Sequence, residues 1–138
     1  MYFWYKFLTY LIYPFAHLYL FIRKLKKKEH PTRYIEKLSQ ISIPRNEGFL
    51  VWCHVASVGE AMSILPLIEK FEQEEKINKI LITTITLSSA EVLKKRFIGN
   101  EKIIHQFLPL DKNIYTKKFL SHWLPDLVIF VESEIWPN

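Results

Sequence analysis

FLVWCHVASVGEAMSILPLIEKFEQEEKINKILITTI, the sequence of residues 49–85, contains the clearest alternation of secondary-structure signals in the chain. Residues 49–55 form an apolar run of strand length, and residues 79–85 form a second run rich in β-branched side chains. Residues 58–75 have helical spacing, because apolar side chains recur on one stripe at Ala61, Ile64, Leu65, Ile68 and Phe71. The stretch therefore predicts a strand–helix–strand unit.

The same alternation continues to the end of the chain. Helices are expected over residues 89–97 and 112–122, and strands over residues 103–108 and 127–131. Strands that alternate with helices imply crossover connections and a parallel sheet, so the predicted fold class is α/β, with a Rossmann-like sheet. Ligands of such sheets bind at the carboxyl ends of the strands.

Length and composition exclude several classes of protein. The chain has 138 residues, which suits one domain, and 49% of them are hydrophobic, which excludes a disordered tail. A single cysteine excludes a disulfide scaffold and a cysteine-cluster metal site. The three glycines, Gly48, Gly59 and Gly99, are far apart in the sequence, which excludes a glycine-rich dinucleotide loop and a P-loop.

Residues 2–22 are apolar and rich in aromatic side chains. Apart from tyrosines, the ionisable residues of this segment are Lys6 and His17. A helix of that length is roughly 30 Å long, enough to cross a bilayer core. Pro14 would kink such a helix and Lys6 would have to snorkel, so a helix lying in the membrane interface remains an alternative. A buried core helix is a third reading. A cleaved signal peptide is disfavoured, because the basic residues follow the apolar run.

The net charge of +5 is concentrated behind this segment. Residues 23–37 contain seven basic side chains and two acidic ones, a net charge equal to that of the whole chain. We call residues 23–37 the basic collar. The remaining domain is near neutral, so the chain is not predicted to bind nucleic acid. A collar directly after an apolar run places the following residues in the cytoplasm and attracts anionic lipid headgroups.

The predicted organisation is therefore a membrane anchor with basic residues over 1–28, a linker over 29–48 and an α/β domain over 49–138. Pro31 is expected to end the first helix. Residues 32–40 are expected to form a short helix, and residues 43–48 a turn.

Candidate site residues follow the first predicted strand. Ser57 and Glu60 have the spacing of a capping box, in which each side chain accepts a hydrogen bond from a backbone N–H of the first helical turn. Ser88 and Glu91 repeat that spacing. The alternative for Glu60 is a carboxylate that acts as general base on a hydroxyl group, with Gly59 allowing close approach of a ligand.

Other polar residues near strand ends have structural interpretations. Asp111 is expected to cap the helix over 112–122. His54 and His105 lie within or near strands, where a hydrogen-bonded core histidine is favoured over a metal ligand, and no metal site is predicted. Glu132 and Glu134 follow an apolar strand and are hard to explain as core residues, which favours a site over the alternative of a solvated loop.

Four ordered motifs carry a resemblance. They are His54-Val55-Ala56-Ser57-Val58-Gly59-Glu60, Thr83-Thr84-Ile85-Thr86, Leu108-Pro109-Leu110-Asp111 and Glu132-Ser133-Glu134-Ile135-Trp136-Pro137-Asn138. Together they resemble the N-terminal half of the bacterial 3-deoxy-D-manno-octulosonic acid (Kdo) transferases of lipid A biosynthesis. Each motif alone is weak, and the ordered set is specific.

The resemblance implies a GT-B glycosyltransferase on the cytoplasmic face of the bacterial inner membrane, which transfers Kdo from CMP-Kdo to a lipid A precursor (lipid IVA) without a metal or cofactor. It implies that Glu60 is the catalytic base. Ser57, Gly59, Glu132 and Glu134 would bind the acceptor or support the site.

Two departures from the family pattern matter. Leu87, Ser88 and Ser89 stand where the family usually has proline and then Thr-Gly. A GT-B enzyme also closes two domains on its substrates, and this chain resembles only the first. We therefore expect a truncated or split gene product, inactive alone, with a separate chain as the partner that carries the C-terminal domain. The alternative is a non-catalytic, membrane-bound remnant or interaction module.

Overall fold

The computed structural model describes residue 7 and residues 14–131, which form two compact units divided between Tyr34 and Ile35. In the first unit, helix α2 spans Pro14–Leu25. Lys27 adopts a left-handed conformation with φ 55°, and the N–H of Lys28 donates to the carbonyl of Arg23 at 2.9 Å. This Schellman-type turn ends the helix well before Pro31, so the expectation that Pro31 would end it is wrong.

Most of the predicted anchor segment, residues 2–22, lies outside the described residues. Within residues 7 and 14–131, none of the helices combines the length and the apolar character needed to cross a membrane. One cation of the basic collar is paired with an acidic side chain of the same segment. Arg23 forms an ion pair with Glu29 at 2.7 Å, and this hydrogen-bonded carboxylate raises the pKa of the Arg23 guanidinium.

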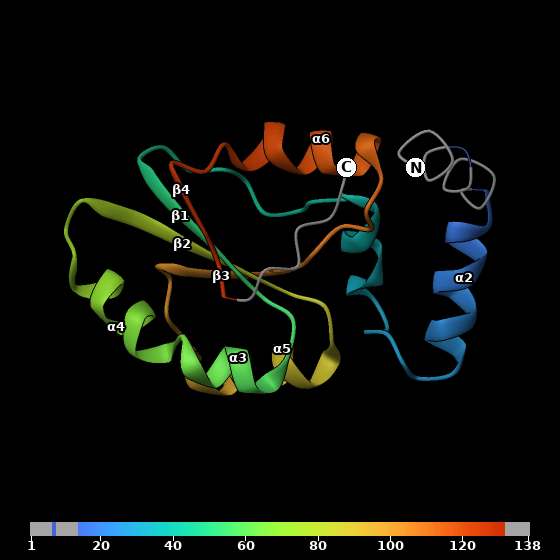
Figure 1. The fold of residues 1–138 in the computed structure, drawn as a ribbon, viewed down its shortest axis with the longest axis horizontal. Helices are drawn as coiled ribbons and strands as arrows, with labels where there is room; N and C mark the ends of the chain where they lie inside the picture. Colours follow the sequence, from blue (N-terminus) through green and yellow to red (C-terminus); the bar gives the residue numbers. More distant parts are fainter. Residues whose placement is uncertain (1–6, 8–13, 132–138) are drawn as a thin grey trace. The chain divides into compact units, whose positions relative to one another are not determined.

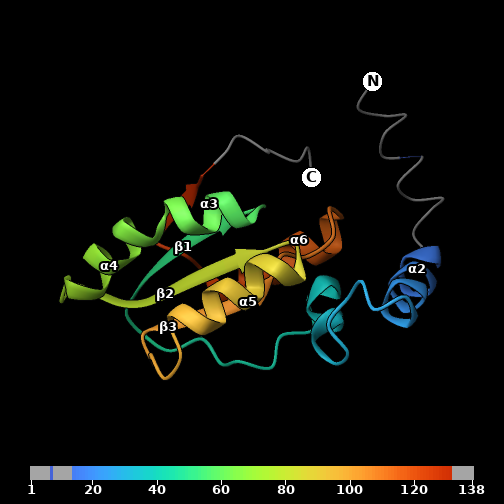
Figure 2. The same ribbon diagram turned by 90° about the horizontal axis from the view of Figure 1, so that it is seen from below.

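The second unit is an α/β domain with a parallel sheet of four strands in the order β3-β2-β1-β4. The strands are listed here in chain order: β1 Phe49–Val55, β2 Ile77–Thr84, β3 Ile103–Phe107 and β4 Leu127–Phe130. Helices α3, α4 and α5 lie on one side of the sheet and α6 on the other (Figures 1 and 2). The predicted parallel α/β fold is confirmed.

A 3-10 helix, η1, spans Arg33–Leu38 and begins two residues before the second unit. The α-helices of the second unit are α3 Val58–Ser63, α4 Leu65–Gln73, α5 Leu87–Arg96 and α6 Asn113–Trp123. The single helix predicted over 58–75 is wrong. It divides at Ile64 because Pro66 has no N–H and fits only the first turn of a new helix.

Two apolar clusters fill the two sides of the sheet. On the side of α3 and α4, Val51, Cys53 and Ile80 are fully buried among the residues of one cluster. On the side of α6, Trp52 packs against Phe119 with ring centroids 4.9 Å apart, and Trp123 is fully buried. Because both faces of the central strands are covered, β1 is apolar except for His54, and the middle of β2, Ile80–Ile82, is apolar and fully buried.

Candidate functional site

The carboxyl ends of the strands lie along one edge of the sheet. The register places Val55 beside Thr84, Thr84 beside Phe107, and His54 beside Phe130. The segments that follow these strands therefore begin at the same edge, which is where open α/β sheets bind ligands. We call this the carboxyl edge.

Glu60 lies on the first turn of α3, directly after β1. Its Oε2 accepts the backbone N–H of Ala56 at 2.7 Å, and its Oε1 accepts the Ser57 hydroxyl at 2.9 Å. Ser57 is the N-cap, and its Oγ accepts the N–H of Glu60 at 3.2 Å. The predicted capping box is therefore confirmed in outline, with Ala56 in place of Ser57 as the backbone donor to the carboxylate. The Glu60 side chain is half-buried.

Gly59 lies next to Glu60 and is exposed. A Cβ added at Gly59 would meet only the Ser57 Oγ, at 3.9 Å, which is an ordinary contact distance. Gly48 differs, because it has φ +102° and an added Cβ would clash with the Asn78 side chain. The fold of this chain thus requires a glycine at position 48 but gives no reason for one at position 59.

The segment after β2 differs from the expectation. The N-cap of α5 is Thr86, whose Oγ1 accepts the N–H of Ser89 at 3.3 Å. The second capping box expected at Ser88 and Glu91 is therefore wrong, because the helix begins two residues earlier than that box requires. The Ser89 hydroxyl is buried against the Thr86 side chain at 2.6 Å.

The predicted cap after β3 is also wrong. The N-cap of α6 is Lys112, whose side chain makes no capping hydrogen bond, and Asp111 precedes it. Backbone bonds from Tyr115 and Thr116 to the Lys112 carbonyl begin the helix instead.

The two strand histidines are hydrogen-bonded, as expected. His54 is buried, with Nδ1 2.9 Å from Thr83 Oγ1, and its ring packs edge-on against Phe130. His105 Nε2 lies 2.9 Å from Thr84 Oγ1. Among the described residues, no group of three or more histidine, cysteine or acidic side chains could hold a metal ion.

Two buried charged residues at the carboxyl edge were missed by the sequence analysis. Glu36 Oε2 accepts the N–H of Phe107 at 2.9 Å, and Lys37 Nζ donates to the Ile85 carbonyl at 3.1 Å. Lys37 was counted in the basic collar, but its side chain is buried in the domain and is not part of an exposed cluster of cations. The local signal, an acidic and a basic residue beside an apolar stripe, is too common to identify such a contact.

Glu132 and Glu134 lie outside the described residues, so their assignment stays a prediction. A separate groove of about 600 Å³ lies between residues 35 and 40–42 and the α6 residues Lys118, Ser121 and His122. None of the predicted site residues lines this groove. The described part of the candidate site is thus the Ser57–Glu60 turn with the adjacent ends of β2 and β3.

Comparison with known proteins adds a family match. Residues 23–138 match the family model described as 3-deoxy-D-manno-octulosonic-acid transferase (kdotransferase). A relative from Rickettsia bellii, named 3-deoxy-D-manno-octulosonic acid transferase, is 41% identical over 97% of this chain and 32% of its own length. No solved structure matches the chain.

Two further relatives come from a plant and from another bacterium. A probable mitochondrial 3-deoxy-D-manno-octulosonic acid transferase of Arabidopsis thaliana is 38% identical over 97% of this chain and 30% of its own length. A 3-deoxy-D-manno-octulosonic acid transferase of Haemophilus influenzae is 29% identical over 99% of the chain and 32% of its own length. The chain thus spans about a third of the length of these curated relatives.

Proposed function

Since the chain belongs to the 3-deoxy-D-manno-octulosonic-acid (Kdo) transferase family, we propose that it supplies the acceptor-side half of a Kdo transferase of the GT-B type. The reaction transfers Kdo from CMP-Kdo to a hydroxyl of a lipid A precursor such as lipid IVA. The donor-side half is supplied by polypeptide that corresponds to the rest of the relatives' length. The proposed reaction uses no metal or cofactor.

The observation that carries this proposal is the position of Glu60 at the carboxyl edge. Its carboxylate is held at two points, by the Ala56 N–H and by the Ser57 hydroxyl. A carboxylate has about four lone-pair positions, so two remain for the hydroxyl of an acceptor sugar. The two bonds fix the orientation of the carboxylate before substrate binds, which is what a positioned base requires.

In the proposed step, the acceptor hydroxyl attacks the anomeric carbon of Kdo, and Glu60 takes the hydroxyl proton. The bond from that carbon to the CMP phosphate oxygen breaks, and CMP leaves with the electron pair. Ser57 orients Glu60, and Gly59 leaves room for the acceptor. Glu132 and Glu134 are proposed to bind the acceptor or support the site.

We also propose that the chain attaches to the cytoplasmic face of the bacterial inner membrane. The support lies in α2, where exposed apolar side chains recur at helical spacing: Phe15, Leu18, Tyr19, Ile22 and Leu25. Lys24 and the exposed Lys26, Lys27 and Lys28 follow on or just after the helix. An exposed apolar stripe with adjacent cations suits a helix that lies in the membrane interface.

The test is a transfer assay with CMP-Kdo and lipid IVA. The chain is assayed alone and after co-expression with the part of the Rickettsia bellii relative that follows the matched region. We expect transfer only from the combination, because half of a cleft neither holds the donor nor excludes water. A well-formed complex without transfer would favour the non-catalytic remnant and contradict the proposed activity.

A further inference from the structure

Lys37 is a buried cation at the carboxyl edge that has no role in the transfer step proposed above. Its side chain belongs to a residue that is only 6% exposed, and its Nζ donates to the carbonyl of Ile85, in the turn between β2 and α5, at 3.1 Å. The same Nζ lies 5.6 Å from the centroid of the Phe107 ring, which is fully buried. Burial of an ammonium group is costly unless polar or aromatic partners hold it, so these contacts specify where the group lies.

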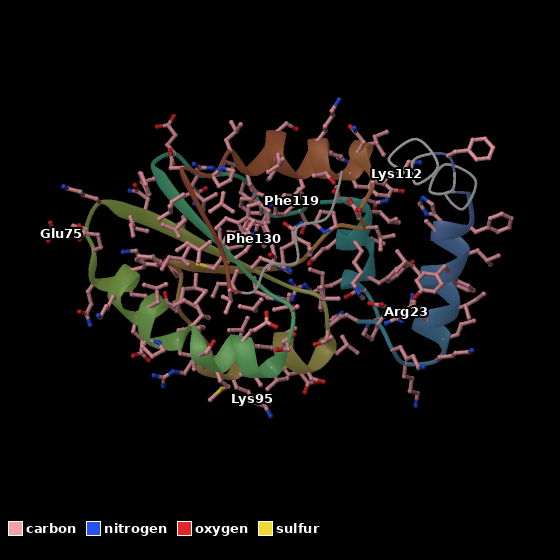
Figure 3. All side chains as sticks on the ribbon, in the orientation of Figure 1. Arg23, Glu75, Lys95, Lys112, Phe119 and Phe130 are labelled. Atoms are coloured by element: carbon pink, nitrogen blue, oxygen red, sulfur yellow. The ribbon has the colours of Figure 1, made fainter. Side chains whose placement is uncertain are left out.

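Helix η1 is attached to the domain by hydrogen bonds that do not involve the Lys37 ammonium group. The segment between β3 and α6 runs past η1 to Lys112 at the start of α6 (Figure 3). The bonds that join η1 to this segment are Glu36 Oε2 with the Phe107 N–H at 2.9 Å, the Lys37 carbonyl with the Leu110 N–H at 2.8 Å, and the Ser39 hydroxyl with the Tyr115 carbonyl at 2.7 Å. The Lys37 side chain instead reaches a different segment, the turn after β2.

The turn between β2 and α5 lies beside the proposed base, Glu60. The last residues of β1 and β2, Val55 and Thr84, are paired, so the segments that follow them leave the sheet side by side. One segment leads into α3 with Glu60, and the other is the turn at residues 85–86, which leads into α5. Helices α3 and α5 lie on the same side of the sheet (Figure 2). An acceptor sugar whose hydroxyl reaches Glu60 is therefore placed against this turn.

We propose that Lys37 is a positioning residue of the acceptor site. Its ammonium group fixes the Ile85 carbonyl, and with it the turn that forms one wall of the site beside Glu60. Side chains held by packing behind a site keep the groups that contact a ligand in their productive geometry. The inference rests on the proposed function for the identity of the ligand, a lipid A precursor. It adds to the site a residue that lies outside the four sequence motifs.

The test measures binding of lipid IVA, presented in detergent micelles, to the chain combined with the remaining part of the Rickettsia bellii relative. Lys37→Met removes the ammonium group and keeps a long, unbranched side chain. It should weaken lipid IVA binding about tenfold, because a displaced turn no longer matches the acceptor. Lys37→Arg should bind within about twofold of the unsubstituted protein, since a guanidinium group can still donate to the Ile85 carbonyl.

Lys102→Met is the matched control at the opposite edge of the sheet. Lys102 directly precedes β3, and its Nζ also donates to backbone carbonyls, those of Glu72 at 2.7 Å and Glu74 at 2.9 Å. Its replacement should lower Tm but leave lipid IVA binding unchanged at a temperature well below Tm. A lysine with a structural role alone behaves in this way, so equal binding by the Lys37→Met and Lys102→Met proteins would overturn the inference.

Hydrogen exchange on the unsubstituted protein gives a readout that does not depend on folding of the variants. Lipid IVA should slow exchange of the amides at residues 85–89, while the amides at residues 100–103, at the other edge, should not change. Exchange at residues 85–89 that does not respond to lipid IVA would overturn the inference, and so would a protein that does not bind lipid IVA. Lipid IVA binding that depends on Lys37 without transfer of Kdo would leave the inference standing and contradict only the proposed activity.

Discussion

The Ser57 hydroxyl and the Glu60 carboxylate hold each other in place: Ser57 Oγ donates to Glu60 Oε1 at 2.9 Å and accepts the Glu60 N–H at 3.2 Å. The same pair of residues thus begins α3 and fixes the orientation of the proposed base. Capping and catalysis do not exclude each other here, because a cap that restrains a carboxylate also prepares it to accept a proton. The two roles separate in their response to substitution.

Glu60→Gln should lower turnover of the combined polypeptides about 10²–10⁴-fold, because an amide cannot take the proton from the acceptor hydroxyl. The free energy of unfolding should fall by only about 1 kcal/mol, since glutamine can still accept the Ala56 N–H. Turnover and chemical unfolding measure the two effects. Glu91→Gln, the same change at an exposed position of α5, is the control and should leave both unchanged. A Glu60→Gln enzyme with normal turnover would remove Glu60 as the base.

Gly59→Ala should leave the fold intact or stabilise it by about 0.5–1 kcal/mol, because the added Cβ meets only ordinary contacts in a helical turn. Turnover should nevertheless fall if an acceptor approaches the backbone there. Gly48→Ala should do the opposite to stability, since position 48 has φ +102° and the new Cβ would meet Asn78. Thermal unfolding of the two variants, with the transfer assay for Gly59→Ala, distinguishes a glycine kept for a ligand from one required by the fold.

Features of the fold that depend on local sequence pattern could be predicted, and features that depend on contacts between distant residues could not. The four strands were predicted to within two residues, and for the central strands β1 and β2 the reason is burial of both faces, which requires apolar side chains. The start of α5 was misplaced because Thr86 and Ser88 are both acceptable caps, and only the end of β2 at Thr84 selects between them. Pro66 was the local signal for the division of the helix predicted over 58–75.

The buried charged residues of η1, Glu36 and Lys37, are the part of the fold that could not be predicted from the sequence. Glu36 bonds to Phe107, 71 residues away, and Lys37 to Ile85, 48 residues away. No periodicity in residues 32–40 encodes such partners, so the short helix expected there gave no indication of these contacts. The part of the site that was predicted, Ser57 to Glu60, is held by contacts within four residues.

Thr86→Ala should destabilise the domain by about 1 kcal/mol, because the N-cap bond to the Ser89 N–H is lost and the buried Ser89 hydroxyl loses a partner. Ser88→Ala should have almost no effect, since Ser88 is exposed and lies inside the helix. Denaturant unfolding of both variants decides the comparison. A larger loss for Ser88→Ala would restore the cap expected from sequence.

Cys53 should resist alkylation at pH 8 in the native chain and react in denaturant. Its side chain is fully buried in β1, and burial raises the pKa of the Cys53 thiol to about 12. Because the folded state keeps the thiol protonated above its ordinary pKa, stability should fall as pH rises from about 9 toward 12, by up to about 1.4 kcal/mol per pH unit. Cys53→Ala should lack this part of the pH dependence. Unfolding free energies at pH 8 and pH 10.5 for both proteins provide the measurement.

Membrane attachment should depend on the cations at the end of α2. Replacing Lys26, Lys27 and Lys28 by glutamine should weaken binding to vesicles that contain anionic phospholipid on the order of 100-fold, because each cation near such a surface contributes about 1 kcal/mol. The substituted and unsubstituted chains should bind almost equally to vesicles of neutral lipid, since only the apolar stripe of α2 then contributes to binding. Replacing the exposed Lys94, Lys95 and Lys117 removes the same charge from the α/β domain and should have little effect on vesicle binding.

Flotation measures the fraction of chain bound to vesicles, and deletion of residues 2–22 should abolish the binding that remains. Equal loss from both lysine sets would show that net charge rather than α2 drives binding, and full binding after the deletion would contradict the attachment proposed here.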